Sequence, residues 1–277
     1  MRRWVLAREL KDLRQAAGLT HTAVAQQLGW QQGKVSKIEG ARQGVGVESV
    51  MALAEVCGAS GQQRDRLVEL AHAARAKGWW ESYADVLPAG GTTYVGFEAG
   101  AASISGFATE TVPELLRTRE YAAAVIAARS GSSGLERRLE LLLSRQRAPV
   151  GDGAADIDVV LAESAVRRAV GGEQVFRGQL RHLVDLGRRP NVRVRVLPFA
   201  AGATATDAPF SLLGFAGERH PDVLCVPHES PRLASTQTEE VEEYRRTFEA
   251  LQSQSLSVEE SLSLLERFER GGEVVGS

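Results

Sequence analysis

Apolar residues in the first 76 positions recur at the 3.6-residue period of an amphipathic α-helix. One stripe of this kind holds Leu6, Leu10, Leu13 and Ala17. Gly18 then ends the predicted helix, and Thr20 is a suitable N-cap for the next one. The same period predicts further helices at about 31–39, 47–56 and 64–76, with a polar loop at 58–63. We therefore expect an all-helical N-terminal domain over residues 1–76.

The pattern changes after residue 78 and mixes helical with strand periods. Helical patterns cover about 94–106, 118–129, a stretch ending near 146, 173–187, 239–253 and 258–270. Strand patterns cover 156–162, 192–197, 210–215 and 222–226. The aromatic cluster of Trp79, Trp80 and Tyr83 is predicted to pack the two parts together. We expect an α+β protein, in which the helical domain joins a mixed C-terminal domain, residues 79–277, with a small sheet and several helices.

Composition excludes several classes of protein. Apolar residues make up 43% and charged residues 25% of the 277 positions, as in ordinary globular proteins. No apolar run reaches the roughly 18 residues of a membrane span, and the N-terminus has no apolar signal core. Cys57 and Cys225 are too few for a disulfide framework and do not have zinc-site spacing. We expect a cytoplasmic protein with no membrane partner.

The net charge of −2 is unevenly distributed. Residues 1–78 hold 12 Lys/Arg and 7 Asp/Glu, a charge of +5, whereas residues 79–277 hold 21 and 28, a charge of −7. A basic head on an acidic body indicates that the head binds a polyanion and the body does not. All four lysines lie in the head, so the body has none for P-loop, Schiff-base or nuclease chemistry.

Two predicted helices joined by a short turn at Gly29 form the pattern of a helix-turn-helix. Small Ala25 lets the helices cross closely, while Val35 and Ile38 fix the second helix to the core. The free face of that helix then holds Gln31, Gln32, Lys34, Ser36 and Lys37. Glutamine can pair with adenine, and lysine with guanine or phosphate. These residues predict sequence-specific binding of double-stranded DNA.

A longer motif accompanies this pattern. It consists of Leu10, Leu13, Arg14, Gly18, Thr20, Ala25, Leu28, Gly29, Val35, Ser36, Ile38, Glu39, Gly40 and Arg42. By these residues, positions 6–43 resemble the Cro/cI-type (XRE) helix-turn-helix regulators. Further motifs, among them Gly78-Trp79-Trp80 and Pro190-Asn191-Val192, extend the resemblance to the actinobacterial members with a large, little-characterised C-terminal domain.

The resemblance implies roles for particular residues. Gln32, Lys34, Ser36 and Lys37 are expected to face bases and nearby phosphates. Thr20, His21 and Arg42 are expected to hold the DNA backbone. The chain departs from the usual motif in having His21 in place of Gln, Gln31 in place of Ser, and Gly33 in place of Ser or Thr. These departures put the phosphate contact of His21 in doubt and make Gln31 a weaker helix cap.

Signatures of catalysis are absent from the sequence of the C-terminal part. It has no Gly-x-Ser-x-Gly elbow, and its only local group of histidines and carboxylates is His220, Asp222, His228 and Glu229. Asp156 and Asp158 share one face of a predicted strand. We interpret both groups as solvated loop and strand-edge residues, and therefore expect no catalytic residue, metal or cofactor.

The sequence thus predicts a transcriptional regulator that acts as a homodimer. Its C-terminal domain is expected to sense a small-molecule effector or a partner protein; the resemblance suggests a small protein encoded nearby. An acidic stripe on the helix at 239–253, beside Val241, Tyr244, Phe248 and Leu251, could receive a basic partner. The alternatives left open are a DNA-targeted nuclease or hydrolase, and a toxin–antitoxin-like component whose C-terminal domain is the effector.

Overall fold

The structure is a computed structural model that describes nine ranges of the chain. They are residues 2–31, 33–41, 43–75, 78–88, 90–131, 133–147, 155–216, 222–227 and 231–271. The chain divides into two compact units, Met1–Glu81 and Ser82–Ser277. Trp79 and Trp80 fall in the first unit, with their rings edge to face at 5.8 Å. That the aromatic cluster joins the two units stays a prediction.

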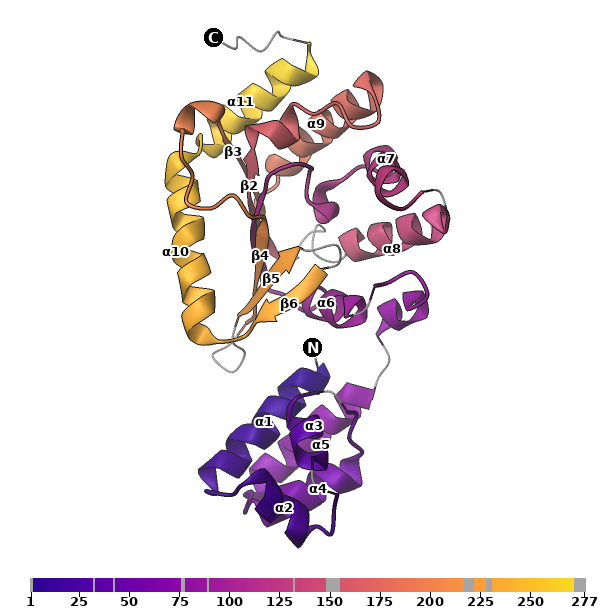
Figure 1. The fold of residues 1–277 in the computed structure, drawn as a ribbon, viewed down its shortest axis with the longest axis vertical. Coiled ribbons are helices and arrows are strands. Elements are labelled where there is room, and N and C mark those ends of the chain that lie inside the picture. The colour runs from indigo at the N-terminus through magenta and orange to yellow at the C-terminus, as the bar shows by residue number, and fades with distance from the viewer. Residues whose placement is uncertain are drawn as a thin grey trace. The chain divides into compact units, whose positions relative to one another are not determined.

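The described part of the first unit consists mainly of five helices (Figure 1). They are α1 (Arg2–Ala16), α2 (His21–Gln27), α3 (Lys34–Glu39), α4 (Val47–Val56) and α5 (Gly61–Arg75). Their apolar faces meet in one core, in which Leu6, Val24 and Val50 are fully buried. The predicted stripe on α1 is confirmed for Leu6 and Leu10, whereas Ala17 is exposed beyond the end of the helix.

Two helix starts in this unit differ from the prediction. α3 begins at Lys34, not near Gln31, because Gly33 has a left-handed backbone with φ of +92°. Gly33 therefore precedes the helix and carries none of the helix-interior cost of glycine. α5 begins at Gly61, inside the predicted polar loop. Ser60 and Gln63 explain this start, since the backbone N–H of each donates to the side chain of the other, at 2.8 and 3.4 Å, as in a capping box.

The second unit is built on a six-stranded mixed sheet with the order β3-β2-β1-β4-β5-β6. Its strands are β1 (Ser103–Ala108), β2 (Asp156–Ala162), β3 (Val192–Leu197), β4 (Phe210–Gly214), β5 (Val223–Pro227) and β6 (Pro231–Ser235). β1, β2 and β3 are parallel, whereas β4, β5 and β6 continue the sheet in antiparallel pairs. The α+β prediction is confirmed.

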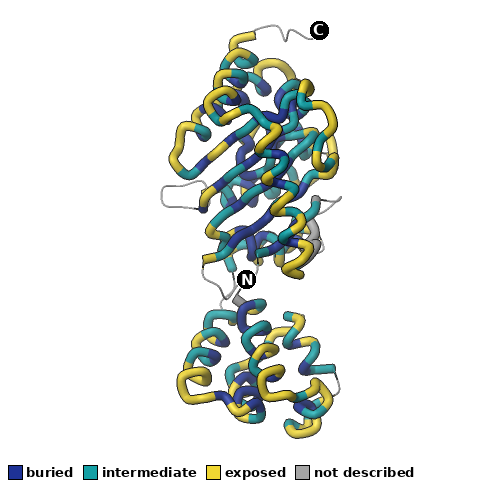
Figure 2. Tube along the Cα trace, turned by 90° about the vertical axis from the view of Figure 1, so that its left-hand side faces the viewer, coloured by how far each residue is buried: buried dark blue, intermediate teal, exposed yellow. Residues whose placement is uncertain are grey.

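Helices cover both faces of this sheet (Figure 1). They are α6 (Gly91–Glu98), α7 (Arg119–Ser130), α8 (Leu135–Arg147), α9 (Glu173–Gly187), α10 (Thr238–Gln254) and α11 (Val258–Glu269). α10 packs on one face through Val241, Phe248 and Leu251, against strand residues that include Phe107 and Val160. α6, α7 and α8 lie on the opposite side (Figure 1). Figure 2 shows the resulting buried strands between helices with exposed outer faces.

The central strand of this sheet was not expected from the sequence. Residues 94–106 are predicted as helix, yet α6 ends at Glu98 and β1 begins at Ser103. Ser103, Ser105 and Gly106 give this segment little strand character of its own. Its conformation is fixed by hydrogen bonding to β2 on one side and β4 on the other. The edge strand β6 was also missed.

The structure corrects the docking surface suggested for α10. Val241, Phe248 and Leu251 are buried in the core against the sheet, so they are not available to a partner. Tyr244 is half-buried and its ring lies 4.9 Å from that of Phe210. The exposed residues of α10 include glutamates of the predicted acidic stripe together with Arg245 and Arg246.

Candidate nucleic-acid interface and candidate ligand cavity

The helix-turn-helix forms as the sequence predicts. Thr20 caps α2, since its hydroxyl oxygen accepts the backbone N–H of Ala23 at 3.1 Å. Gly29 makes the turn with φ of +63°, and the backbone N–H of Trp30 donates to Ala25 at 2.8 Å. Ala25, Val35 and Ile38 are buried, so both helices are fixed to the core and the opposite face of α3 is left free.

Polar side chains occupy the free face of α3 and the turn before it. Lys37 is exposed, while Lys34 and Ser36 are half-buried. The Lys34 ammonium lies 3.7 Å from the centre of the Trp30 ring, which holds the charge at the start of the helix. Gln31 is exposed in the turn. Gln32 and Arg42, which were also predicted to bind DNA, lie outside the described residues.

A buried ion pair, which the sequence analysis did not assign, joins the two ends of this motif. The Glu39 carboxylate accepts from Nε and Nη2 of Arg14 at 2.7 and 2.9 Å, and Nη1 of Arg14 donates to the Leu19 carbonyl at 2.5 Å. The hydrogen bond and the nearby charge of Glu39 outweigh burial and raise the pKa of Arg14. Both residues belong to the XRE-like motif. Their opposite charges were the feature of the sequence from which this ion pair could have been predicted.

His21 meets the same carboxylate. Its Nε2 lies 2.9 Å from Oε2 of Glu39, while 47% of its side chain remains exposed. His21 is therefore held at the start of α2 beside α3. The phosphate contact that the resemblance implies for this position stays a prediction, and only the part of the ring turned away from Glu39 is free to make it.

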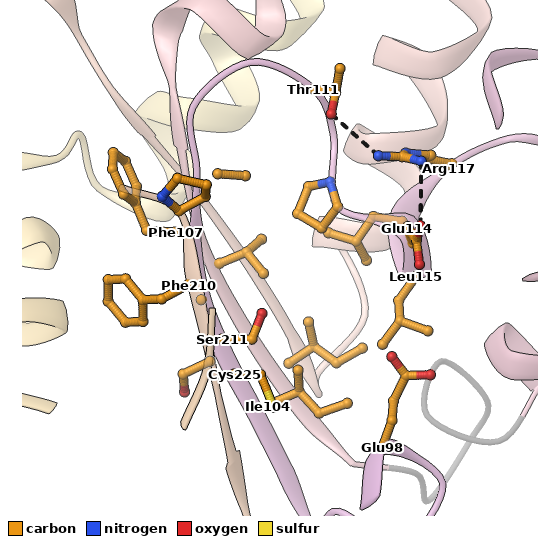
Figure 3. A pocket seen from close by; sticks show the side chains of 18 of the residues that line it. Glu98, Ile104, Phe107, Thr111, Glu114, Leu115, Arg117, Phe210, Ser211 and Cys225 are labelled. Carbon is orange, nitrogen blue, oxygen red and sulfur yellow. Dashed lines mark hydrogen bonds and ion pairs between the residues drawn. The ribbon is translucent and has the colours of Figure 1, made fainter. Parts of the chain in front are cut away.

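The second unit contains a cavity of about 790 Å³ on the sheet face opposite α10 (Figure 3). Side chains on that face form its floor: Ile104 of β1, Ile157 and Val159 of β2, Ser211 of β4 and Cys225 of β5. Gly106 lies in the centre of the floor, beside Ser211 in the strand register. The opposite wall comes from the segment 109–117 after β1 and from α6, α7 and α8.

A network of charged groups forms part of this wall. Nε and Nη2 of Arg145 each donate to the Glu98 carboxylate at 2.7 Å, and Nη1 donates to Glu114 at 2.5 Å. Arg117, which is buried, donates to the Val112 carbonyl at 2.6 Å and to the Thr111 hydroxyl at 3.2 Å. Its Nη1 is 4.0 Å from Glu114, so that contact is an ion pair without a hydrogen bond.

These positive charges act strongly on Glu114. Arg145 contributes most, with Arg117 and Arg129 adding to it, and together they overcome burial and lower the pKa of Glu114 to about 2. The Glu114 side chain keeps 41% of its surface accessible. Glu114 is also one of the residues that line the cavity. The carboxylate is therefore ionised and can meet a bound molecule.

Two further polar groups that line the cavity, Tyr94 of α6 and Cys225 of β5, are uncharged. Burial raises the pKa of the Cys225 thiol to about 12, with a smaller contribution from Glu98. Burial also raises the pKa of Tyr94 well above its ordinary value. Both groups therefore stay protonated at neutral pH, and Cys225 is not poised as a thiolate nucleophile.

Most of the other candidates from the sequence either form ion pairs or lie outside the described residues. Asp158 is paired with Arg195 and accepts from Gln252 at 3.1 Å. It lies on an interior strand, so its assignment to a solvated edge is wrong. Asp222 pairs with Arg245, whereas His220, His228 and Glu229 lie outside the described residues. Among the residues that can be described, no cluster of three or more metal-ligating side chains occurs.

Comparison with known families gives a match for each unit. Residues 5–67 match a family described as a helix-turn-helix domain, which agrees with the geometry of α2 and α3 and supports a DNA-binding regulator. Residues 92–267 match the family described as "Domain of unknown function (DUF5753)". That match covers more than half of the chain, which therefore belongs to this family. No curated protein and no solved structure gives a match.

Membrane insertion by a helix has no support in the structure. Across the described ranges, every helix is too short or too polar to span a bilayer.

Proposed function

We propose that the protein is a sequence-specific transcriptional regulator whose second unit senses a small molecule. The observation that carries the first part is the free face of α3. Val35 and Ile38 hold this helix on the core, so Ser36 and Lys37 can approach base edges and phosphates in a major groove. The charge of +5 on residues 1–78 supports binding to a polyanion.

The cavity carries the second part of the proposal. Its volume of about 790 Å³ lies within the range of roughly 300–1,000 Å³ that is typical of small-molecule sites. An apolar floor with a few charged and hydroxyl groups is the usual construction of such sites. A partner protein docked on α10 is a weaker interpretation, since the apolar residues of that helix are buried against the sheet.

We propose that this unit acts by binding and performs no chemistry. An effector can change DNA binding only if it has different affinities for the DNA-competent and DNA-incompetent states. We further propose a cytoplasmic homodimer of the Cro/cI type, because two copies of α3 reading two half-sites provide more specificity than one.

In vitro selection of duplexes with the full chain tests the DNA-binding part. Lys37→Ala should cost about 1–3 kcal/mol of binding to the selected duplex and relax the preference at one or two base pairs. Lys11→Ala is the matched control, because it removes a lysine that is also exposed, from α1, and should leave the base preference unchanged. If Lys37→Ala keeps both the affinity and the base preference of the parent, α3 is not the reading helix.

A further inference from the structure

We infer that the cavity binds a small organic acid, with its carboxylate at the Arg117–Arg129 end and its apolar body over β1 and β2. This inference rests on the proposed sensing function and names the class of ligand that the site would take.

The charge on the lining favours an anion. Glu110 is paired with Arg168, which leaves Glu98 and Glu114 to balance the three guanidinium groups of the lining. Those groups belong to Arg117, Arg129 and Arg145, and all three lower the pKa of Glu114. Two carboxylates against three guanidinium groups leave one positive charge for a ligand to neutralise.

Two of these arginines have donors to spare. Arg129 is exposed at the edge of the lining, and no hydrogen bond or ion pair joins it to a residue that the structure describes. Arg117 uses Nε and Nη2 on Val112 and Thr111, but its nearest carboxylate oxygen is 4.0 Å from Nη1. A guanidinium group has five N–H donors in a planar fork that suits a carboxylate. A ligand carboxylate can therefore be held there by charge-assisted hydrogen bonds.

The rest of the cavity fixes the orientation of such a ligand. Ile104, Ile157 and Val159 offer an apolar floor, and Gly106 places no side chain above it. The Ser211 hydroxyl on the floor and the Tyr94 hydroxyl on α6 add two uncharged polar groups. Glu98 lies on α6 with Tyr94 and contributes to the raised pKa values of Tyr94 and Cys225. The charge of Glu98 disfavours a second carboxylate beside Tyr94, so a neutral polar group of the ligand suits this position.

Calorimetric titration of the full chain with matched ligand sets tests the inference. The probes are 4-phenylbutyrate, 2-naphthylacetate and dodecanoate, each beside its own primary amide. At least one acid should bind about tenfold or more tightly than its amide, as expected for a lost charge-assisted hydrogen bond. Arg129→Gln should reduce the affinity of that acid to that of the amide. Arg246→Gln removes an exposed arginine from α10, outside the cavity, and should change neither affinity.

The outcomes separate the ligand class from the proposed function. One outcome is that acids and amides bind equally tightly, with affinities that neither Arg129→Gln nor Arg246→Gln changes. That result would overturn the inference that the ligand is an acid, while keeping a small-molecule site in the second unit. Failure of every acid and amide to bind at millimolar concentration would overturn the inference as a whole. Binding of the selected duplex, measured on the same preparations, reports the DNA-binding function independently of either result.

Discussion

Burial decides how much a single ion pair matters in this protein. Arg14 and Glu39 keep only 8% and 4% of their side-chain surface accessible, whereas Arg66 and Glu9 keep 43% and 22%. Both pairs are within hydrogen-bond distance, at 2.7 and 2.8 Å. When one partner of a buried pair is removed, the remaining charge is left unpaired and out of contact with water. When one partner of an exposed pair is removed, the remaining charge is hydrated. The two pairs are therefore a natural comparison within one unit.

We predict that Glu39→Ala lowers the free energy of unfolding of the first unit by about 3–5 kcal/mol, because Arg14 loses its counterion. Glu9→Ala, the control, should cost about 1 kcal/mol or less. All four tryptophans of the chain lie in the first unit, so tryptophan fluorescence during urea unfolding reports this unit. Similar decreases in the free energy of unfolding for Glu39→Ala and Glu9→Ala would show that burial does not make the Arg14–Glu39 pair more important for stability.

Glu114 gives a pH-dependent prediction for the second unit. Its pKa is about 2 in the folded state against an ordinary value of 4.5, so the unfolded state takes up the proton first on acidification. The stabilisation is therefore complete above about pH 4.5 and is lost as the pH falls towards 2. Glu114→Gln removes this contribution, and its unfolding midpoint should fall less steeply than that of the parent across this window.

The four tyrosines all lie in the second unit, and near-ultraviolet circular dichroism of these residues follows its unfolding. Glu136→Gln, which removes a carboxylate from the exposed pair with Arg119, is the matched control. If the unfolding midpoint of Glu114→Gln falls with pH as steeply as that of the parent, Arg145 and its neighbours do not hold this carboxylate ionised.

At the scale of elements, the start of α3 depends on one glycine. Gly33 has φ of +92°, and a Cβ atom placed there would meet nothing within 4 Å. A side chain at position 33 would therefore destabilise the protein through its backbone conformation and not through a clash with neighbouring atoms. Gly33→Ala should lower the stability of the first unit by about 1–2 kcal/mol, whereas Gly33→Asn should cost less, because asparagine tolerates left-handed conformations.

Gly44→Ala is the control for this prediction. Gly44 also has open space around it, but its φ is not in the left-handed region. Alanine there should leave stability unchanged or raise it by about 0.4–1 kcal/mol, through the entropy of the unfolded chain. Equal effects at positions 33 and 44 in urea unfolding would refute the role given to the backbone of Gly33.

Elements with a strong local pattern could be predicted from the sequence, whereas others could not. β2, α9 and β3 match their predicted bounds residue for residue, because apolar positions recur in them at a clear strand or helix period. β1 could not be found this way, since its serines and glycine become a strand only between β2 and β4. Long-range pairing overrides local preference at that position.

The same contrast applies to the candidate sites at the scale of the whole molecule. The face of α3 is local, so its polar residues could be named from spacing alone. The cavity collects residues from four strands and three helices, and its Arg145–Glu98 pair joins positions 47 residues apart. Only the sheet order brings these groups together. A sequence pattern could show that this region has charged residues, but not that they face a common space.

The last prediction concerns how many copies of the chain bind DNA. One α3 helix offers only a few side chains to base edges, and a mismatched base pair costs about 1–3 kcal/mol, so a single copy discriminates poorly among sites. We predict a homodimer with a mass of twice 29.8 kDa in sedimentation at micromolar concentration. Selected duplexes should then contain two inverted half-sites about one helical turn apart. A mass of 29.8 kDa with and without DNA, together with selected sequences that lack twofold symmetry, would rule this arrangement out.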